Sequence, residues 1–98
     1  MNMQNLMAQA QKMQRDIQKK KDEIDKKLFT GKSEMVEVVY NGKKEMVSIK
    51  ILNANLNSDD LEILEDMILL ASRNAIEQID KEIDEKMGSF GSGLGGLF

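Results

Sequence analysis

The 98-residue sequence contains no His and no Cys, the side chains that most often serve as catalysts or metal ligands near neutral pH. The absence of Cys excludes a disulfide framework and thiolate metal sites, and it fits a reducing compartment. Only Phe29, Tyr40, Phe90 and Phe98 are aromatic, so base stacking is not the main binding mode. The composition therefore favours a binding module over an enzyme and disfavours a single-strand binder.

The sequence also lacks a long apolar run. Its longest, Met67–Ala71, is far shorter than the roughly 20 residues that span a bilayer. The sequence starts with Met-Asn-Met-Gln and lacks the apolar stretch that forms the core of a signal peptide. We therefore expect one domain that is soluble and cytoplasmic, with no membrane partner.

Charge is unevenly distributed along the chain. Residues 1–33 contain eight Lys or Arg and four Asp or Glu, whereas residues 34–98 contain six and thirteen. The two segments therefore carry +4 and −7, which gives the overall charge of −3. A negative overall charge argues against binding a polyanion unless the positive charge is collected on one surface. The placement of the basic residues decides the question.

The first segment has the pattern of an amphipathic helix. Its apolar residues recur at intervals of three and four and occupy an arc of roughly 120°, as in a helix packed on one side. They are Met3, Leu6, Met7, Ala10, Met13, Ile17, Ile24 and Leu28. Lys20 and Lys21 interrupt this rhythm, so we expect looser packing after Ile17.

Four basic residues lie on the opposite side of this helix, within roughly 60° of one another. They are Lys12, Arg15, Lys19 and Lys26. Charged residues that have an oppositely charged residue four positions away on a helix most often form a solvent-exposed face without a ligand. The alternative is phosphate contact, because these residues span roughly 21 Å, enough to follow several phosphates of a duplex. The sequence has no helix-turn-helix or zinc motif to read bases.

Two β-rich runs follow, residues 35–40 and 45–51, joined through Asn41-Gly42. Asn-Gly favours a hairpin because it supplies the positive φ angles of a tight turn. Antiparallel pairing gives one face that we expect to form the core. Its residues are Val36, Val38, Tyr40, Val47, Ile49 and Ile51. A short strand near residues 27–30 would make three strands.

A second helix is expected from a cap cluster at residues 55–60 to about Met87. Between Leu61 and Ile76, ten of sixteen residues are apolar and cover roughly 260° of the helical wheel. One sheet cannot cover so wide an arc, so either the first helix and the sheet enclose it together or a second subunit does. We favour a homodimer. The predicted interface residues are Leu64, Met67, Ile68 and Ala71.

The end of the sequence, residues 89–98, is rich in Gly and Leu. This composition predicts a flexible tail after a single domain formed by residues 1–88. Four apolar residues of the tail could instead anchor a partner: Phe90, Leu94, Leu97 and Phe98.

Acidic residues gather at the start of the second helix. They are Asp59, Asp60, Glu62, Glu65 and Asp66. Their spacing differs from that of an EF-hand loop, and acids at a helix start complement its dipole without a ligand. Paired carboxylates need burial to shift a pKa for catalysis, and these lie on predicted solvated faces. We therefore expect no metal, no cofactor, no small-molecule substrate and no catalytic residue.

The order of these pieces resembles the YbaB/EbfC family of small bacterial nucleoid-associated proteins. Each motif is weak alone, but together they span nearly the whole chain. They are residues 7–13, Thr30-Gly31, the hairpin 36–51 around Asn41-Gly42, residues 64–68, Asn74-Ala75 and the Met87-Gly88 entry to the tail.

The resemblance implies an α+β subunit of α-β-β-β-α order, with a small antiparallel sheet flanked by two long helices, and a tweezer-like homodimer. It also implies DNA binding with limited sequence specificity, in the cytoplasm and nucleoid. We therefore predict a homodimer that contacts duplex DNA mainly through backbone phosphates, using the basic face of the first helix. The alternative is a non-catalytic adaptor dimer whose second helix and Gly/Leu tail bind another protein.

Overall fold

A computed structural model describes the backbone of residues 2–94 and the side chains of residues 2–88. Its elements are α1 (Met3–Lys26), β1 (Leu28–Lys32), β2 (Val36–Asn41), β3 (Met46–Ile51), the single turn η1 (Ser58–Asp60) and α2 (Leu61–Leu94). This α-β-β-β-α order confirms the predicted α+β class, including the short strand ahead of the hairpin.

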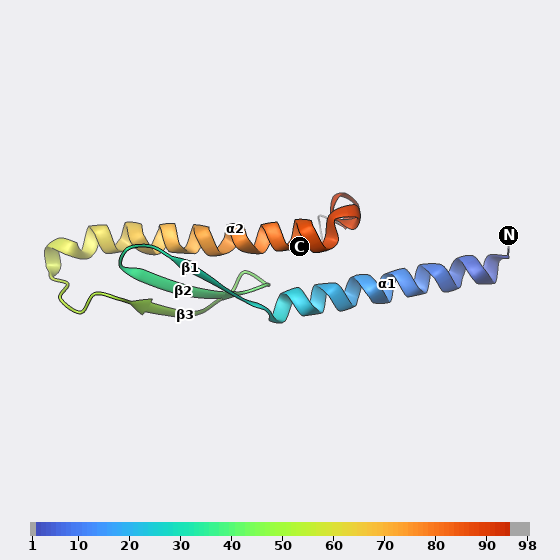
Figure 1. Cartoon of the computed structure of the whole chain (residues 1–98), viewed down its shortest axis with the longest axis horizontal. Coiled ribbons are helices and arrows are strands. Elements are labelled where there is room, and N and C mark those ends of the chain that lie inside the picture. Colours follow the sequence, from blue (N-terminus) through green and yellow to red (C-terminus); the bar gives the residue numbers. More distant parts are fainter. Residues whose placement is uncertain (1, 95–98) are drawn as a thin grey trace.

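The molecule is elongated, with extents of 70 × 20 × 16 Å. Figure 1 shows α2 lying along the sheet, while α1 starts from the far end of the sheet and extends away from it. The N-terminus of α1 is the point farthest from the sheet in this view. α1 is therefore an arm that is joined to the body at its C-terminal end.

The sheet is antiparallel, with strand order β1-β2-β3. Gly31 of β1 lies opposite Val38 of β2, and Val38 in turn lies opposite Ile49 of β3. Val36 lies opposite Ile51 in the same way. Because directly opposite residues share a side of the sheet, all five belong to one face.

α2 covers this face over β1 and β2. Val36 and Val38 of β2 pack against Ala71 and Ala75 of α2, and none of the four has exposed surface. A Cβ on Gly31 would overlap the carbonyl oxygen of Ala71 and lie 2.8 Å from the backbone nitrogen of Ala75. Gly31 therefore permits the close approach of β1 to α2 on which this core depends.

β3 is not part of this core, in contrast to the prediction. Ile49 is 46% exposed although it lies opposite Val38, which is fully buried. Val47 and Ile51 are also about half exposed. In the described part of the chain, α2 contacts β1 and β2 but not β3. The sequence pattern identified an apolar sheet face correctly, but one helix covers only part of it.

The hairpin turn forms where predicted, with a different backbone geometry. No described Gly has a positive φ, and the positive φ of the turn, 65°, belongs to Lys44. Gly42 is required for another reason: a Cβ there would overlap the carbonyl group of Ile24 in α1. Asn41 holds the turn, because its Oδ1 accepts a hydrogen bond from the amide of Glu45 at 3.1 Å.

The apolar stripe of α1 is mostly exposed, which corrects the prediction of a helix packed on one side. Met3, Met7 and Met13 are each more than half exposed. Ile24 is the one buried residue of α1. The part after Ile17, which was expected to pack more loosely, is therefore the part that attaches α1 to the body.

α2 continues to Leu94, past the expected end near Met87. The backbone of residues 89–94 thus belongs to the helix, and residues 95–98 lie outside the described part of the chain. The boundary between a domain of residues 1–88 and a flexible tail of residues 89–98 stays a prediction.

Candidate nucleic-acid interface

α1 places the four predicted phosphate-binding residues on exposed positions along one helix. Asn2 caps the helix, because its Oδ1 accepts a hydrogen bond from the amide of Gln4 at 2.9 Å. Neither Gly nor Pro interrupts the following 24 residues, which at 1.5 Å per residue extend for roughly 36 Å. All four predicted residues are exposed: Lys12, Arg15, Lys19 and Lys26.

Three of these four residues border one shallow hollow on the surface of α1. Its lining residues are Arg15, Gln18, Lys19, Asp22, Glu23 and Lys26. Lys12 lies outside the hollow, toward the N-terminus. The structure therefore brings three predicted residues together, and it places two carboxylates among them.

The four basic residues form no ion pair with any residue that the structure describes. The ion pairs that are present use Lys21, Lys27, Lys44 and Lys86. Asp16, Asp22 and Glu23 each lie four positions from one of the four basic residues, a spacing at which opposite charges often pair. Because those pairs are not made, the four cations remain available to an external anion.

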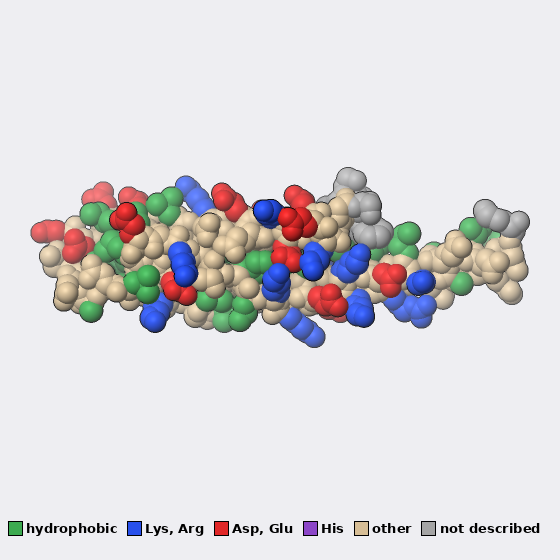
Figure 2. Space-filling model, in the orientation of Figure 1, with side chains coloured by type: hydrophobic (Ala, Val, Ile, Leu, Met, Phe, Trp, Pro, Cys, Tyr) green, Lys and Arg blue, Asp and Glu red, His purple; other side chains and the backbone are tan. Residues whose placement is uncertain are grey.

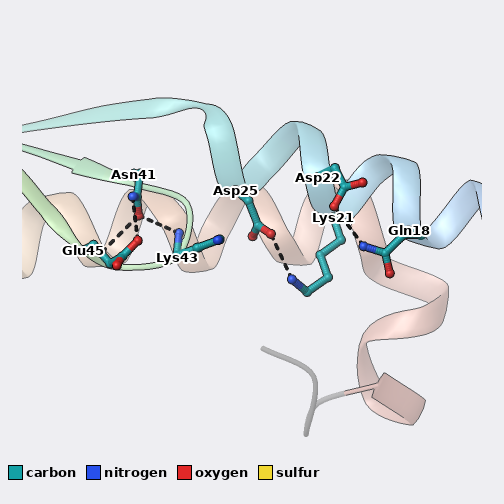
Figure 3. Close-up of polar contacts among 7 residues, drawn as sticks. All are labelled: Gln18, Lys21, Asp22, Asp25, Asn41, Lys43 and Glu45. Atoms are coloured by element: carbon teal, nitrogen blue, oxygen red, sulfur yellow. Dashed lines mark hydrogen bonds and ion pairs between the residues drawn. The ribbon is translucent and has the colours of Figure 1, made fainter.

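The hairpin adds a basic residue that sequence reasoning did not select. The amide of Gly42 donates a hydrogen bond to the carbonyl oxygen of Asp25 at 3.2 Å, so the hairpin tip rests against the end of α1. Lys43 is exposed and lines a hollow together with Lys26. Figure 3 shows Lys43 directed from the hairpin toward α1. The sequence shows that Lys43 and Lys44 follow the Asn41-Gly42 turn. Only the fold shows that this turn contacts α1.

Lys27, which follows the last residue of α1, ties the arm to α2. Its Nζ donates a hydrogen bond to Oε2 of Glu82 at 2.8 Å, and Nζ of Lys86 lies 3.7 Å from the other carboxylate oxygen. The hydrogen bond from Lys27 lowers the pKa of Glu82 below its ordinary value, against the opposing effect of burial. The Lys27 ammonium also lies 5.5 Å from the ring centroid of Phe29. These contacts fix the point at which the arm leaves the body.

The four predicted interface residues of α2 lie in or beside the core of the subunit. Ala71 is fully buried against the sheet. Leu64, Met67 and Ile68 pack partly buried around it. Their contact with a second copy stays a prediction. Among the side chains of α2 that the structure describes, the exposed large apolar ones are different residues: Leu61, Ile63, Leu69 and Leu70.

The acidic cluster lies at the opposite end of the molecule from the arm, as Figure 2 shows, whereas basic side chains predominate near the C-terminal half of α1. The carboxylate of Asp60 accepts a hydrogen bond from the amide of Asn57 at 3.0 Å, while Oδ1 of Asn57 accepts one from the amide of Asp59 at 2.9 Å. The side chains of Asn57 and Asp60 therefore cap the start of the helical segment. No group of three or more His, Cys, Asp or Glu among the described residues could hold a metal ion.

None of the helices within the described residues has the length and apolar character required to cross a membrane. The model of the YbaB/EbfC DNA-binding family matches residues 1–94. A nucleoid-associated protein of Streptococcus thermophilus is 41% identical over 96% of this chain and 97% of its own length. Another, from Ligilactobacillus salivarius, is 35% identical over 99% of this chain and 95% of its own length. On these matches, which extend over nearly the whole sequence, the chain belongs to the YbaB/EbfC DNA-binding family.

Proposed function

We propose that this protein is a nucleoid-associated DNA-binding protein that contacts duplex DNA mainly through backbone phosphates, with limited sequence specificity. One observation carries the proposal: α1 extends from the body with a row of exposed cations that pair with no described residue. The row consists of Lys12, Arg15, Lys19 and Lys26. The family description and the names of the relatives support DNA as the ligand.

The chemistry of the row favours phosphates over bases. Phosphates on one strand are spaced by about 3.4 Å along the duplex axis, so a row of roughly 21 Å is long enough to meet several of them. Arg15 is the one guanidinium in the row, and a single bidentate contact to guanine cannot specify a site alone. Asp22 and Glu23 lie within the same face and reduce its positive potential. Binding should therefore be weak at physiological salt and tolerant of sequence.

We propose that the protein acts as a non-catalytic homodimer in the nucleoid, with a role in chromosome organisation and gene expression. Two copies would present two arms to one duplex, the tweezer-like arrangement that the family resemblance implies. Support for a dimer comes from the exposed apolar side chains of β3 and α2, which the subunit itself does not cover.

A binding assay across a salt series tests the proposal. If the row neutralises roughly four phosphates on one arm or eight on two, log K should fall with log salt with a slope of about −4 to −7. Affinity for any duplex should then fall by about two to four decades between roughly 50 and 200 mM salt. A variant with Ala at all four positions should lose this salt dependence. Unchanged affinity and slope in a folded quadruple variant would show that α1 is not the DNA-binding element.

The adaptor hypothesis makes the opposite prediction. If the second helix and the tail bind another protein, deleting residues 89–98 should abolish that complex, and the full chain should show no salt-sensitive DNA binding. Under the DNA-binding proposal the same deletion leaves DNA affinity unchanged. It should also shift the thermal midpoint by no more than a few degrees, because a Gly-rich segment buries little apolar surface.

A further inference from the structure

We infer that the arm carries a site of reversible oxidation, at which a hydroperoxide converts three exposed methionines of α1 to methionine sulfoxide. They are Met3, Met7 and Met13. Oxidation at this site unwinds the outer part of α1 (residues 3–16) and so withdraws two cations of the basic row from DNA. The effect on DNA affinity rests on the proposed function, whereas the oxidation and the unwinding do not depend on it.

The methionines of α1 are the most accessible ones that the structure describes. Met3 is 75% exposed, Met7 is 59% exposed and Met13 is 53% exposed. Met46 of β3 is 42% exposed, and Met87 of α2 has no exposed surface. An oxidant must reach the sulfur atom, so the rate of oxidation follows exposure. The three thioethers of α1 therefore react first, and Met87 reacts last.

The oxidation of a thioether requires only a hydroperoxide, such as hydrogen peroxide. The sulfur lone pair attacks the outer oxygen of the peroxide, so that an S–O bond forms and the O–O bond breaks. The proton of the outer oxygen passes to the leaving oxygen, which departs as water or an alcohol; sulfur is oxidised and the peroxide is reduced. Because the sequence contains no Cys, no thiol of the chain competes for the oxidant. Methionine sulfoxide reductases restore the thioether, which makes the change reversible.

The site lies away from the basic row of α1, so bound DNA leaves it open. At 100° per residue, each of the three methionines projects roughly 80° or more from every member of the row. Met3 and Lys12 project in opposite directions, roughly 180° apart. A duplex held by the row therefore does not shield the thioethers, and the oxidant reaches them in the free and in the DNA-bound protein alike.

The outer part of α1 has little besides its own backbone to keep it helical. Every side chain from Asn2 to Asp16 is exposed, and Ile24 is the one buried residue of the helix. A helix of about 15 residues without tertiary packing is only marginally stable in water. Apolar residues four positions apart, such as Met3 and Met7, are spaced to support each other. The helix of the outer part thus depends on the apolar character of its methionines.

Oxidation removes this support, because a sulfoxide is polar and no longer favours contact with an apolar neighbour. Lys12 and Arg15 lie in the outer part of α1, whereas Lys19 and Lys26 lie nearer to the buried anchor, Ile24. Unwinding therefore takes two cations out of the row and leaves two in place. The body is unaffected, since none of the three reacting methionines belongs to its core.

Peptide mapping by mass spectrometry tests the site. The full chain is treated with graded hydrogen peroxide, with and without a saturating duplex, and each methionine is followed by its gain of an oxygen atom. The three methionines of α1 should react at the same rate in both samples. Met87 should react at least about tenfold more slowly, because the oxidant reaches it only after unfolding.

Circular dichroism tests the unwinding. Complete oxidation of the three methionines should reduce the helical signal by the equivalent of about 10 to 15 residues, and treatment with the reductases should restore it. The matched control combines Met3→Leu, Met7→Leu and Met13→Leu, because Leu has a similar volume, favours a helix and resists peroxide. The same treatment should leave the helical signal of this triple Leu variant unchanged, although Met46 and Met87 are still present.

DNA affinity is the regulatory readout. The oxidised wild type should bind every duplex about tenfold more weakly or worse, with a salt slope shallower by about two for each arm that binds. The oxidised triple Leu variant should bind like the same variant before oxidation. A loss of affinity confined to the wild type assigns the effect to the methionines of α1.

The inference is overturned if Met87 reacts as fast as Met3, or if a bound duplex protects the methionines of α1. It is also overturned if the fully oxidised wild type keeps its helical signal, or if the triple Leu variant loses it equally. Loss of DNA affinity in the quadruple Ala variant but not in the oxidised wild type would overturn the regulatory effect. If the quadruple Ala variant binds like the wild type, the proposed function fails, while the mass map and the helical signal still decide the oxidation site.

Discussion

Gly42 and Asp25 are joined by a hydrogen bond of 3.2 Å from the amide of Gly42 to the carbonyl oxygen of Asp25. The bond holds the tip of the β2–β3 hairpin against the last turn of α1. With the pair of Lys27 and Glu82, it determines how the arm is set on the body. The hairpin thus serves as a support for the arm as well as part of the sheet.

Replacing Gly42 by Ala should lower the free energy of unfolding by about 1–3 kcal/mol, because the added Cβ would overlap the carbonyl group of Ile24. Urea denaturation measures the loss. Gly88→Ala is the matched control, since a Cβ there meets nothing within 4 Å and Ala favours a helix by about 1 kcal/mol. Equal stability of Gly42→Ala and the wild type would show that the hairpin does not constrain the arm.

Lys19→Ala should weaken binding to all duplexes alike and make the salt slope shallower by about one, because a phosphate contact positions the protein without reading sequence. Arg15→Glu should weaken binding further, since it adds repulsion to the lost contact. Fluorescence anisotropy with two unrelated duplexes measures both effects. Lys32→Ala removes an exposed lysine outside the row and should change neither. A loss confined to one duplex would contradict phosphate contact.

Lys43→Ala should also reduce DNA affinity, by less than the loss of a central residue of the row, and should leave the thermal midpoint unchanged. The reason is that Lys43 extends the basic surface beside Lys26 without an ion pair to any described residue. Lys44→Ala is the informative comparison, because Lys44 pairs with Asp80 and should affect stability instead. If Lys43→Ala bound DNA with the affinity of the wild type, Lys43 would not be part of the DNA interface, which would then be confined to α1.

Glu82→Gln should lower stability at neutral pH by about 0.5–1 kcal/mol, a small amount because the partner Lys27 is half exposed and screened by solvent. The pKa of Glu82 is lower in the folded state than its ordinary value of 4.5, so its contribution is fully present above that value. The contribution is lost as the pH falls through the folded-state pKa. Thermal unfolding should therefore distinguish the variant from the wild type at neutral pH, and the difference should vanish in acid. Glu85→Gln is the control at neutral pH: it changes an exposed acid on the same helix that forms no ion pair with a described residue, so it should leave the thermal midpoint unchanged there.

Local features of the fold were predictable because they depend on neighbouring residues. The spacing of apolar residues from Met3 to Ile24 indicates a helix, and Asn41-Gly42 indicates a turn, whatever lies around them. The order of the elements followed from these signals. The exposed positions of the four basic residues followed from helical spacing in the same way.

What covers an apolar face could not be predicted, because that depends on distant parts of the chain. Ile49 and Met13 carry the pattern of packed residues, yet both are exposed in the single subunit. The spacing of apolar residues shows that one face of an element is apolar, but it does not show which other element covers that face. Lys43 was missed for the same reason, since its place beside Lys26 depends on the docking of the hairpin on α1.

The attachment of α1 at one end has a mechanical consequence. An arm of roughly 36 Å that turns by about 10° at its base moves its tip by roughly 6 Å, which is comparable to the width of a minor groove. The pivot lies near Ile24, whose burial and contact with the hairpin limit how far it can turn. Small changes in packing at this pivot are thus amplified into large changes in reach. If α1 binds DNA as proposed, the stiffness of the joint should influence, together with the charge of the arm, which duplex shapes the protein can bind.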